Sequence, residues 1–231
     1  MVPIRDQADH SAGFAMSNRE VTWKQYLQSV DQARCPMPQT SLGKNRDALS
    51  STDPRIRDDY PVTGVGAEHV KCYIAWLNHS AKSAYRLPTL SEWQVAARKA
   101  QPRLWSSLER AGAAALVRSD PRSSVREATV QTVASGPPSS DGIFDLEGNA
   151  GELVSDLHYL SEREAKWCGG SGLSSPLVTG RGGYDVERGS GREIPGEFRS
   201  VGHLACGIPM NSVGFRLASS LGRPLVRLRP H

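Results

Sequence analysis

The stretch that decides the fold is GIFDLEGNAGEL, residues 142–153, because apolar residues, glycines and spaced carboxylates coincide nowhere else in the chain. Three bulky apolar residues of this stretch are expected to enter a hydrophobic core: Ile143, Phe144 and Leu146. Gly148 and Asn149 permit a tight turn, since both residue types tolerate positive φ. The stretch therefore predicts a folded-back loop that is anchored in a core.

Two acids, Asp145 and Glu152, lie on either side of this turn. A folded-back loop would bring the two carboxylates together. Carboxylates, together with backbone carbonyls freed by a glycine turn, suit a hard cation such as calcium. The alternative is a hairpin loop with two solvated acids, and composition alone favours it.

Two helices are expected upstream of the loop. The first covers residues 67–80, where one apolar stripe recurs at helical spacing: Val70, Tyr73, Ile74 and Leu77. The second covers residues 90–100 and follows a capping box, with Thr89 as the N-cap and Glu92 at the third helical position. Arg86, just before this box, is interpreted as a structural ion-pair partner.

Several motifs occur together in one order: PVTGV (61–65), YRLPTLSEWQVAAR (85–98), the central loop, GGS (169–171) and VGFRLA (213–218). In this order the chain resembles the formylglycine-generating enzyme (sulfatase-modifying factor) family. The resemblance implies an α+β, C-type-lectin-like single domain with many short strands, two main helices and long loops. It divides the chain into an irregular N-terminal arm (1–18), the formylglycine-generating-enzyme-like domain (19–218) and a basic tail (219–231).

The same resemblance identifies where catalysis would occur. Enzymes of this family oxidise a substrate cysteine with oxygen, using a copper-binding cysteine pair shortly after the Gly-Gly-Ser strand. Counting from Gly169, the matching positions here are Ser174 and Thr179. Thiolates suit the soft Cu(I) ion and hydroxyls do not, so we expect no copper and no oxidase activity. A relocated pair made of Cys168 and Cys206 is the weaker alternative.

Relatives in this family bind calcium at positions that match the central loop. The resemblance implies one structural calcium ion, bound by the side chains of Asp145 and Glu152 and by the backbone carbonyls of Gly148 and Ala150. A second calcium site found in relatives is expected to be lost, because residues 104–117 are alanine-rich and lack the matching Asn or Asp pattern.

A partner-binding surface is expected on residues 172–197 and the strand that follows. Lectin-like folds carry recognition on long loops held by a rigid scaffold, and function concentrates in such loops. Arginine and aromatic residues are enriched at interface hot spots, which favours one set of candidates: Arg181, Tyr184, Arg192, Phe198 and Arg199. A glycine-rich loop that binds nothing is the alternative.

Bulk properties exclude some classes of function. The 231 residues carry a net charge of +4 with mixed signs along most of the chain, which gives no specific nucleic-acid signal. No apolar run reaches membrane-spanning length. The four cysteines show neither CxxC nor zinc spacing, so reduced thiols and a cytoplasmic location are expected: Cys35, Cys72, Cys168 and Cys206.

Three functions remain open from the sequence. The first is a catalytically silent scaffold or binding module for a protein or peptide partner. The second is an oxidoreductase with altered chemistry. The third is a variable ligand-display protein of a diversity-generating retroelement, a class that uses the same lectin-like scaffold. The missing copper-binding cysteines favour the first over the second.

Overall fold

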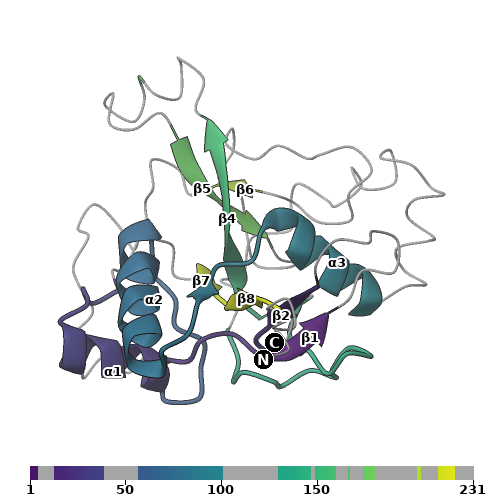
Figure 1. The fold of residues 1–231 in the computed structure, drawn as a ribbon, viewed down its shortest axis with the longest axis horizontal. Helices are drawn as coiled ribbons and strands as arrows, with labels where there is room; N and C mark the ends of the chain where they lie inside the picture. The colour runs from purple at the N-terminus through teal and green to yellow at the C-terminus, as the bar shows by residue number, and fades with distance from the viewer. Residues whose placement is uncertain are drawn as a thin grey trace, which may run out of the picture.

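The chain folds into a mixed α+β domain, seen here in a computed structural model that describes residues 1–4, 13–38, 57–100, 130–146, 149–159, 166, 174–179, 202–203 and 213–221. These parts contain three long helices and two small sheets: α1 (Trp23–Ala33), α2 (Ala67–Ala81), α3 (Leu90–Ala100), β1 (Val2–Ile4), β2 (Phe14–Met16), β3 (Tyr85–Arg86), β4 (Gly151–Tyr159), β5 (Ser174–Thr179), β6 (Gly202–His203), β7 (Val213–Phe215) and β8 (Ala218–Ser220). Figure 1 shows α1 and α2 packed together on one side and α3 on the other, with β4 between them.

The helices begin where the sequence supplies capping groups. At α1 the Thr22 hydroxyl accepts from the Gln25 amide at 3.3 Å, and the Gln25 side chain accepts from the Thr22 amide at 3.0 Å. The box predicted for α3 is also present: the Glu92 amide donates to Thr89 Oγ1 at 3.1 Å, and the Thr89 amide donates to Glu92 Oε2 at 2.8 Å. These reciprocal bonds satisfy amides that have no partner inside the helix.

The chain passes from one sheet to the other through α3, between β3 and β4, and returns through the short connection between β7 and β8. One sheet has the order β1-β2-β8-β3 and the other β6-β5-β4-β7. β4 pairs with β7 in parallel, with Glu152 opposite Gly214. The VGFRLA motif (213–218) therefore spans two strands: β7 belongs to one sheet, β8 to the other, and Arg216 lies in the two-residue connection between them.

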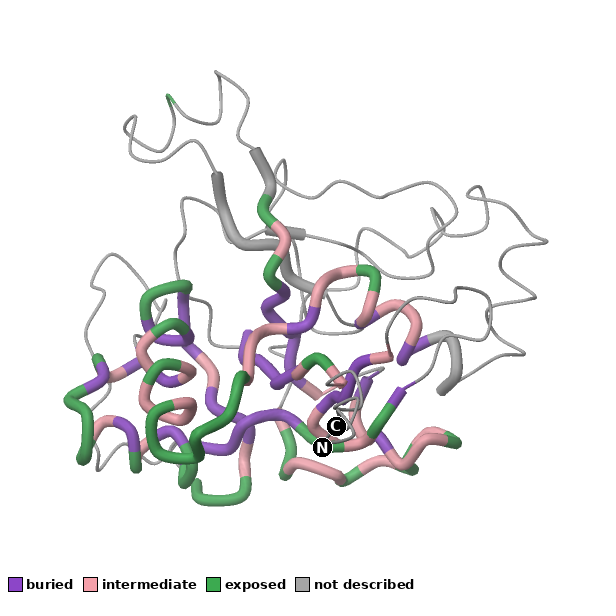
Figure 2. Tube along the Cα trace, in the orientation of Figure 1, coloured by how far each residue is buried: buried purple, intermediate pink, exposed green. Residues whose placement is uncertain are grey.

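β4 separates two hydrophobic cores, because consecutive side chains of a strand point to opposite faces. Leu153 belongs to the core that is shared with α1, α2 and β7. Val154, the next residue, belongs to the core that is shared with α3, β1 and β2. Figure 2 shows the buried residues gathered along these elements. Ile143 and Leu146 enter the second core as predicted, whereas Phe144 is only half-buried.

Three expectations from the sequence are wrong. Residues 2–4 and 14–16 are not an irregular arm but strands β1 and β2, and β2 pairs with β8 at the other end of the chain. β8 also crosses the expected start of the tail at residue 219. Short strands whose partners lie two hundred residues away carry no local periodicity from which to predict them.

The third wrong expectation concerns the cysteines. Cys35 and Cys72 form a disulfide that links the end of α1 to α2, with a Cα–Cα distance of 5.6 Å. The expected cytoplasmic location was based on reduced thiols and loses that support. Within the described residues, no helix is both long and apolar enough to cross a membrane.

Candidate functional site

The central loop is held in place by its two buried apolar side chains and by two residues in the left-handed region. Asp145 has a φ of 57° and Asn149 a φ of 61°, in agreement with the turn predicted around Asn149. Gly148 lies outside the described residues. β4 begins directly after the loop, so the loop delivers Glu152 into the interior beside α3 and the β7–β8 connection.

Glu152 is paired with Arg216 in the interior. Both side chains are fully buried, at 1% and 0% exposure. Arg216 Nε donates to Glu152 Oε2 at 2.7 Å, and Arg216 Nη2 donates to Glu152 Oε1, so the pair is bidentate. The Trp93 indole also donates to Glu152 Oε2, at 2.5 Å. Both oxygens of this carboxylate are therefore occupied by protein donors.

The remaining donors of Arg216 bind backbone carbonyls. Nη2 also donates to the Phe144 carbonyl at 3.1 Å, and Nη1 donates to the Ser17 carbonyl at 3.3 Å. Burial by itself lowers the pKa of Arg216, but the charge and the hydrogen bonds of the Glu152 carboxylate outweigh it, so the net shift is upward. The guanidinium stays charged and joins β4, the central loop and the N-terminal segment.

Glu20 is a second buried carboxylate near this pair, at 1% exposure. Its Oε1 accepts from Asn149 Nδ2 at 3.1 Å, which ties the loop to the start of α1. Its Oε2 has no hydrogen-bond partner within the part of the chain that the structure describes. Burial raises the pKa of Glu20 to about 8, against the lowering effect of Arg216 and with a further rise from Glu152. Glu20 is thus mostly protonated at neutral pH.

Asp145 accepts hydrogen bonds from backbone amides in this geometry. Its two oxygens accept from the amides of Ala134 and Gly136, the latter at 3.3 Å. These bonds fasten the 133–136 turn to the central loop, as expected for a carboxylate that meets clustered amides.

These contacts involve two residues of the expected calcium site, Asp145 and Glu152; the other two expected ligands are the carbonyls of Gly148 and Ala150. Glu152 is held by Arg216 and Trp93, so an ion that used this carboxylate would first have to open a buried ion pair. Among the described residues, no group of three or more His, Cys, Asp or Glu side chains is arranged to hold a metal ion. In this structure both Asp145 and Glu152 accept hydrogen bonds from protein groups.

The two positions that the resemblance matches to copper ligands lie at opposite ends of β5. Ser174 is paired with Tyr159 and Thr179 with Glu152 on the neighbouring strand. With a rise of about 3.4 Å per residue, five steps along a strand separate these two positions by about 17 Å. Two thiolates that share one metal ion have sulfurs no more than about 4.6 Å apart, twice a typical metal–sulfur bond. The backbone of β5 thus holds the two matched positions at opposite ends of one strand.

The other site candidates from the sequence cannot be placed. The expected partner-binding residues lie outside the described residues, and so do the remaining two cysteines: Arg181, Tyr184, Arg192, Phe198, Arg199, Cys168 and Cys206. Conversely, the sequence did not predict the buried network. It gave no role to Glu20 or Arg216, and it predicted Asn149 as a turn residue but not as the partner of Glu20. The sequence signal for Arg216 was a charged residue within the otherwise apolar run VGFRLA (213–218).

Comparison with known proteins gives the same fold. The family model described as the sulfatase-modifying factor enzyme 1-like domain matches residues 5–221. No match was found among curated proteins. Similar solved structures include that of CarF, with a TM-score of 0.61 and 21% identity over 96% of this chain and 94% of that one.

Two further structures are similar. PvdO from Pseudomonas aeruginosa has a TM-score of 0.53 and 19% identity over 90% of this chain and 81% of that one. Treponema denticola variable protein 1 has a TM-score of 0.54 and 14% identity over 90% of this chain and 84% of that one. At these identities the likeness shows the fold alone, and it confirms the fold that the sequence predicted.

Proposed function

Because the chain belongs to the family of sulfatase-modifying factor enzyme 1-like domains, we propose that it is a catalytically silent member that serves as a binding or scaffold module for a protein or peptide. The observation that carries this proposal is the position of Ser174 and Thr179 at the two ends of β5. The residue types are hydroxyls where the resemblance implies thiolates, and a separation of about 17 Å along an extended strand supports a site that holds no shared copper ion.

The buried charged network supports the same conclusion. A catalytic carboxylate or arginine must reach substrate, but Glu152 and Arg216 have no exposed surface and their polar atoms bond to each other, to Trp93 and to backbone carbonyls. Such a network fixes the loop and the two sheets relative to each other. Its role fits that of residues that hold other parts of the fold in position, not that of residues that contact a substrate.

A rigid scaffold leaves recognition to the connections between its elements. We place the partner surface on Arg181, Tyr184, Arg192, Phe198 and Arg199, where the residue types suit an interface. This segment follows β5 directly, and β5 is paired along β4, so its starting point is anchored in the sheet.

Two assays test this function. In the first, a sulfatase-type peptide is incubated with the chain, oxygen and Cu(I), and the mass change from cysteine to formylglycine is followed by mass spectrometry. We expect no product, with a formylglycine-generating enzyme as the positive control. The Ser174→Cys/Thr179→Cys variant is expected to stay inactive too, because β5 separates the two thiols. Turnover by the wild-type chain would contradict the proposal.

The second assay concerns binding. Deleting residues 176–195 would remove four residues of β5 (Ser174–Thr179), so point substitutions are the cleaner test. Proteins captured from native-host lysate are compared between the wild-type chain, an Arg181→Ala/Tyr184→Ala/Arg192→Ala variant, and a control with Lys24→Ala on α1. We expect the triple variant to lose the main captured partner and the control to keep it. Equal capture by all three would refute the assigned surface.

A variable ligand-display role is the alternative, and one observation favours it: the similarity in fold to Treponema denticola variable protein 1. A reverse transcriptase gene and a template repeat beside the gene for this chain would support that role over a fixed binding module. An oxidoreductase with altered chemistry would need Cys168 and Cys206 as a new pair. Turnover lost on substitution of both cysteines would be its signature.

A further inference from the structure

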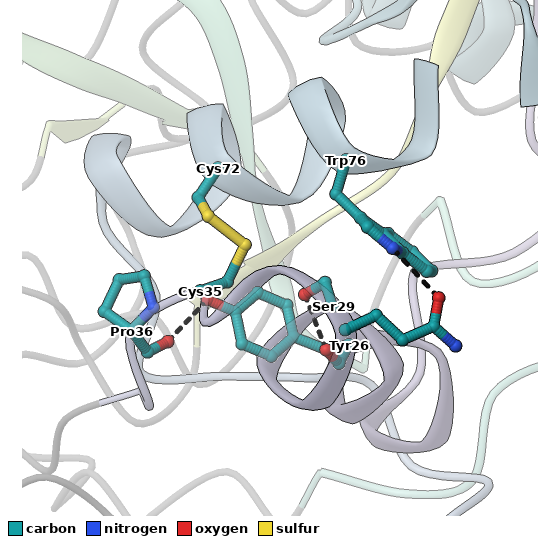
Figure 3. The surroundings of a disulfide bond; sticks show 7 residues. Tyr26, Ser29, Cys35, Pro36, Cys72 and Trp76 are labelled. Carbon is teal, nitrogen blue, oxygen red and sulfur yellow. Dashed lines mark hydrogen bonds between the residues drawn. A yellow bond between two sulfur atoms is a disulfide. The ribbon is translucent and has the colours of Figure 1, made fainter. Parts of the chain in front are cut away.

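The connection that leaves α1 is fastened to α2 by a covalent bond. Cys35 follows the C-cap residue Arg34, whose φ of 53° turns the chain out of the helix, and its sulfur is bonded to that of Cys72 in the middle of α2. Figure 3 shows the bond bridging the gap between the two helices. The Cα–Cα distance of 5.6 Å lies within the range that disulfides normally span.

Non-covalent contacts hold the same connection in place independently of the bond. The Cys35 amide donates to the Ser29 carbonyl at 3.2 Å, and the Tyr26 hydroxyl donates to the Pro36 carbonyl at 2.8 Å (Figure 3). His69 lies on α2 one turn before Cys72, and its Nε2 is 3.2 Å from the Met37 carbonyl of the connection. The fold therefore places the two cysteines side by side.

Because the fold holds Cys35 and Cys72 side by side, it favours their oxidation to a disulfide. Two thiols that the native structure holds together have a high effective concentration for each other, so the native fold stabilises the disulfide and the disulfide stabilises the fold. Cys35 is 2% exposed and Cys72 is half-buried, so an external thiolate has little access to the Cys35 sulfur, and exchange depends on which sulfur can be reached. These features are typical of a structural disulfide rather than a labile one.

We propose that Cys35–Cys72 is a permanent structural crosslink and that the chain matures in an oxidising compartment. The two cysteine thiols reduce an external disulfide, either low-molecular-weight or carried by an oxidoreductase. One disulfide forms in this chain, and the donor is released as two thiols. Structural disulfides persist where such donors are maintained and are rare in reducing compartments. This inference does not depend on the binding role proposed above.

The size of the closed loop sets the expected effect on stability. The cysteines are 37 residues apart. Restriction of the unfolded chain over a loop of this length predicts that reduction lowers the Tm by about 10 °C.

The first experiment uses the chain as its own cells make it. Cells are lysed in N-ethylmaleimide, and the peptides that contain Cys35 and Cys72 are examined by mass spectrometry. We expect both cysteines to be unlabelled before reduction and labelled after it. Labelling of both cysteines without prior reduction would overturn the proposal.

The second experiment measures the Tm of the purified chain with and without dithiothreitol. We expect a fall of about 10 °C for the wild type and the same fall for a Cys168→Ser/Cys206→Ser control. The Cys35→Ser/Cys72→Ser variant should melt at the temperature of the reduced wild type and should not respond to reductant. An unchanged Tm of the reduced wild type would overturn the structural role, and this comparison needs no variant to fold.

Discussion

Arg216 and Glu152 form a bidentate ion pair that is sealed from solvent, although 64 residues separate them in the sequence. The pair joins β4 to the connection at which the chain passes from one sheet to the other. Phe215 and Leu217, on either side of Arg216, face the core shared with α1 and α2. Because side chains alternate along the chain, the Arg216 guanidinium points away from this core, toward the Glu152 carboxylate.

Removing one partner of this pair should be strongly destabilising. Glu152→Gln leaves the buried guanidinium without its counter-charge, and we expect a loss of about 3–5 kcal/mol in the free energy of unfolding, measured with urea. The matched control is Lys24→Gln, which breaks the exposed Lys24–Asp58 pair at 3.8 Å and should change stability by less than about 0.5 kcal/mol. Equal effects of the two substitutions would mean that the buried pair is not a structural joint.

Glu20 should make stability depend on pH. Burial raises the pKa of Glu20 from 4.5 to about 8, so the unfolded chain releases this proton first as pH rises. The stability contributed by the protonated group is complete below pH 4.5 and is lost as pH rises toward 8. Glu20→Gln keeps an acceptor for Asn149 without the titration.

The comparison with wild type isolates this residue from other titrating groups. We expect the free energy of unfolding of Glu20→Gln, measured with urea, to rise relative to that of wild type between pH 5 and pH 8. The rise should be on the order of 3 kcal/mol. A difference between the two proteins that stays constant across this range would show that Glu20 does not titrate there.

His69 should make stability depend on pH in the opposite sense to Glu20, with stability lost as pH falls. Its Nδ1 accepts from the Gly66 amide at 3.2 Å, so Nε2 carries the proton toward the Met37 carbonyl. Burial lowers the pKa of His69 below 6.5, so stability is present above pH 6.5 and is lost as pH falls through the folded pKa. The stability advantage of wild type over His69→Asn should shrink from pH 7.5 to pH 5. An advantage that grows on acidification would contradict a neutral, bonded imidazole.

Two glycines should respond differently to substitution. A Cβ at Gly214 would lie 2.5 Å from the Val62 carbonyl oxygen, whereas Gly142 has open space around it but a φ of +77°. Gly214→Ala should cost about 1–3 kcal/mol through displacement of β7. Gly142→Asn should cost little, since asparagine tolerates positive φ. Thermal melts of the two variants decide this, and a milder effect at Gly214 would mean that β7 can shift freely.

These contacts explain which features could be predicted from the sequence. Thr89 and Glu92 are three residues apart, so their capping box was visible, and Arg86 pairs with Glu92 at 2.6 Å as interpreted. The helix predicted at residues 67–80 is α2, Ala67–Ala81. By contrast, the Asn149–Glu20 bond and the Cys35–Cys72 disulfide join residues that only the tertiary fold brings together. No spacing rule or periodicity reports such pairs.

The calcium ion predicted in the central loop would compete with Arg216 for one carboxylate. Folded-state binding should raise stability by roughly 3 kcal/mol at a hundredfold excess of calcium over its Kd. Melts of the wild-type chain with calcium and with excess chelator test this directly, and Glu152→Gln should abolish any difference. Arg216→Gln frees both oxygens of Glu152 from the guanidinium, so it should strengthen calcium binding if the ion uses Glu152. Identical midpoints with calcium and chelator, in wild type and in Arg216→Gln alike, would show that protein contacts alone hold the loop.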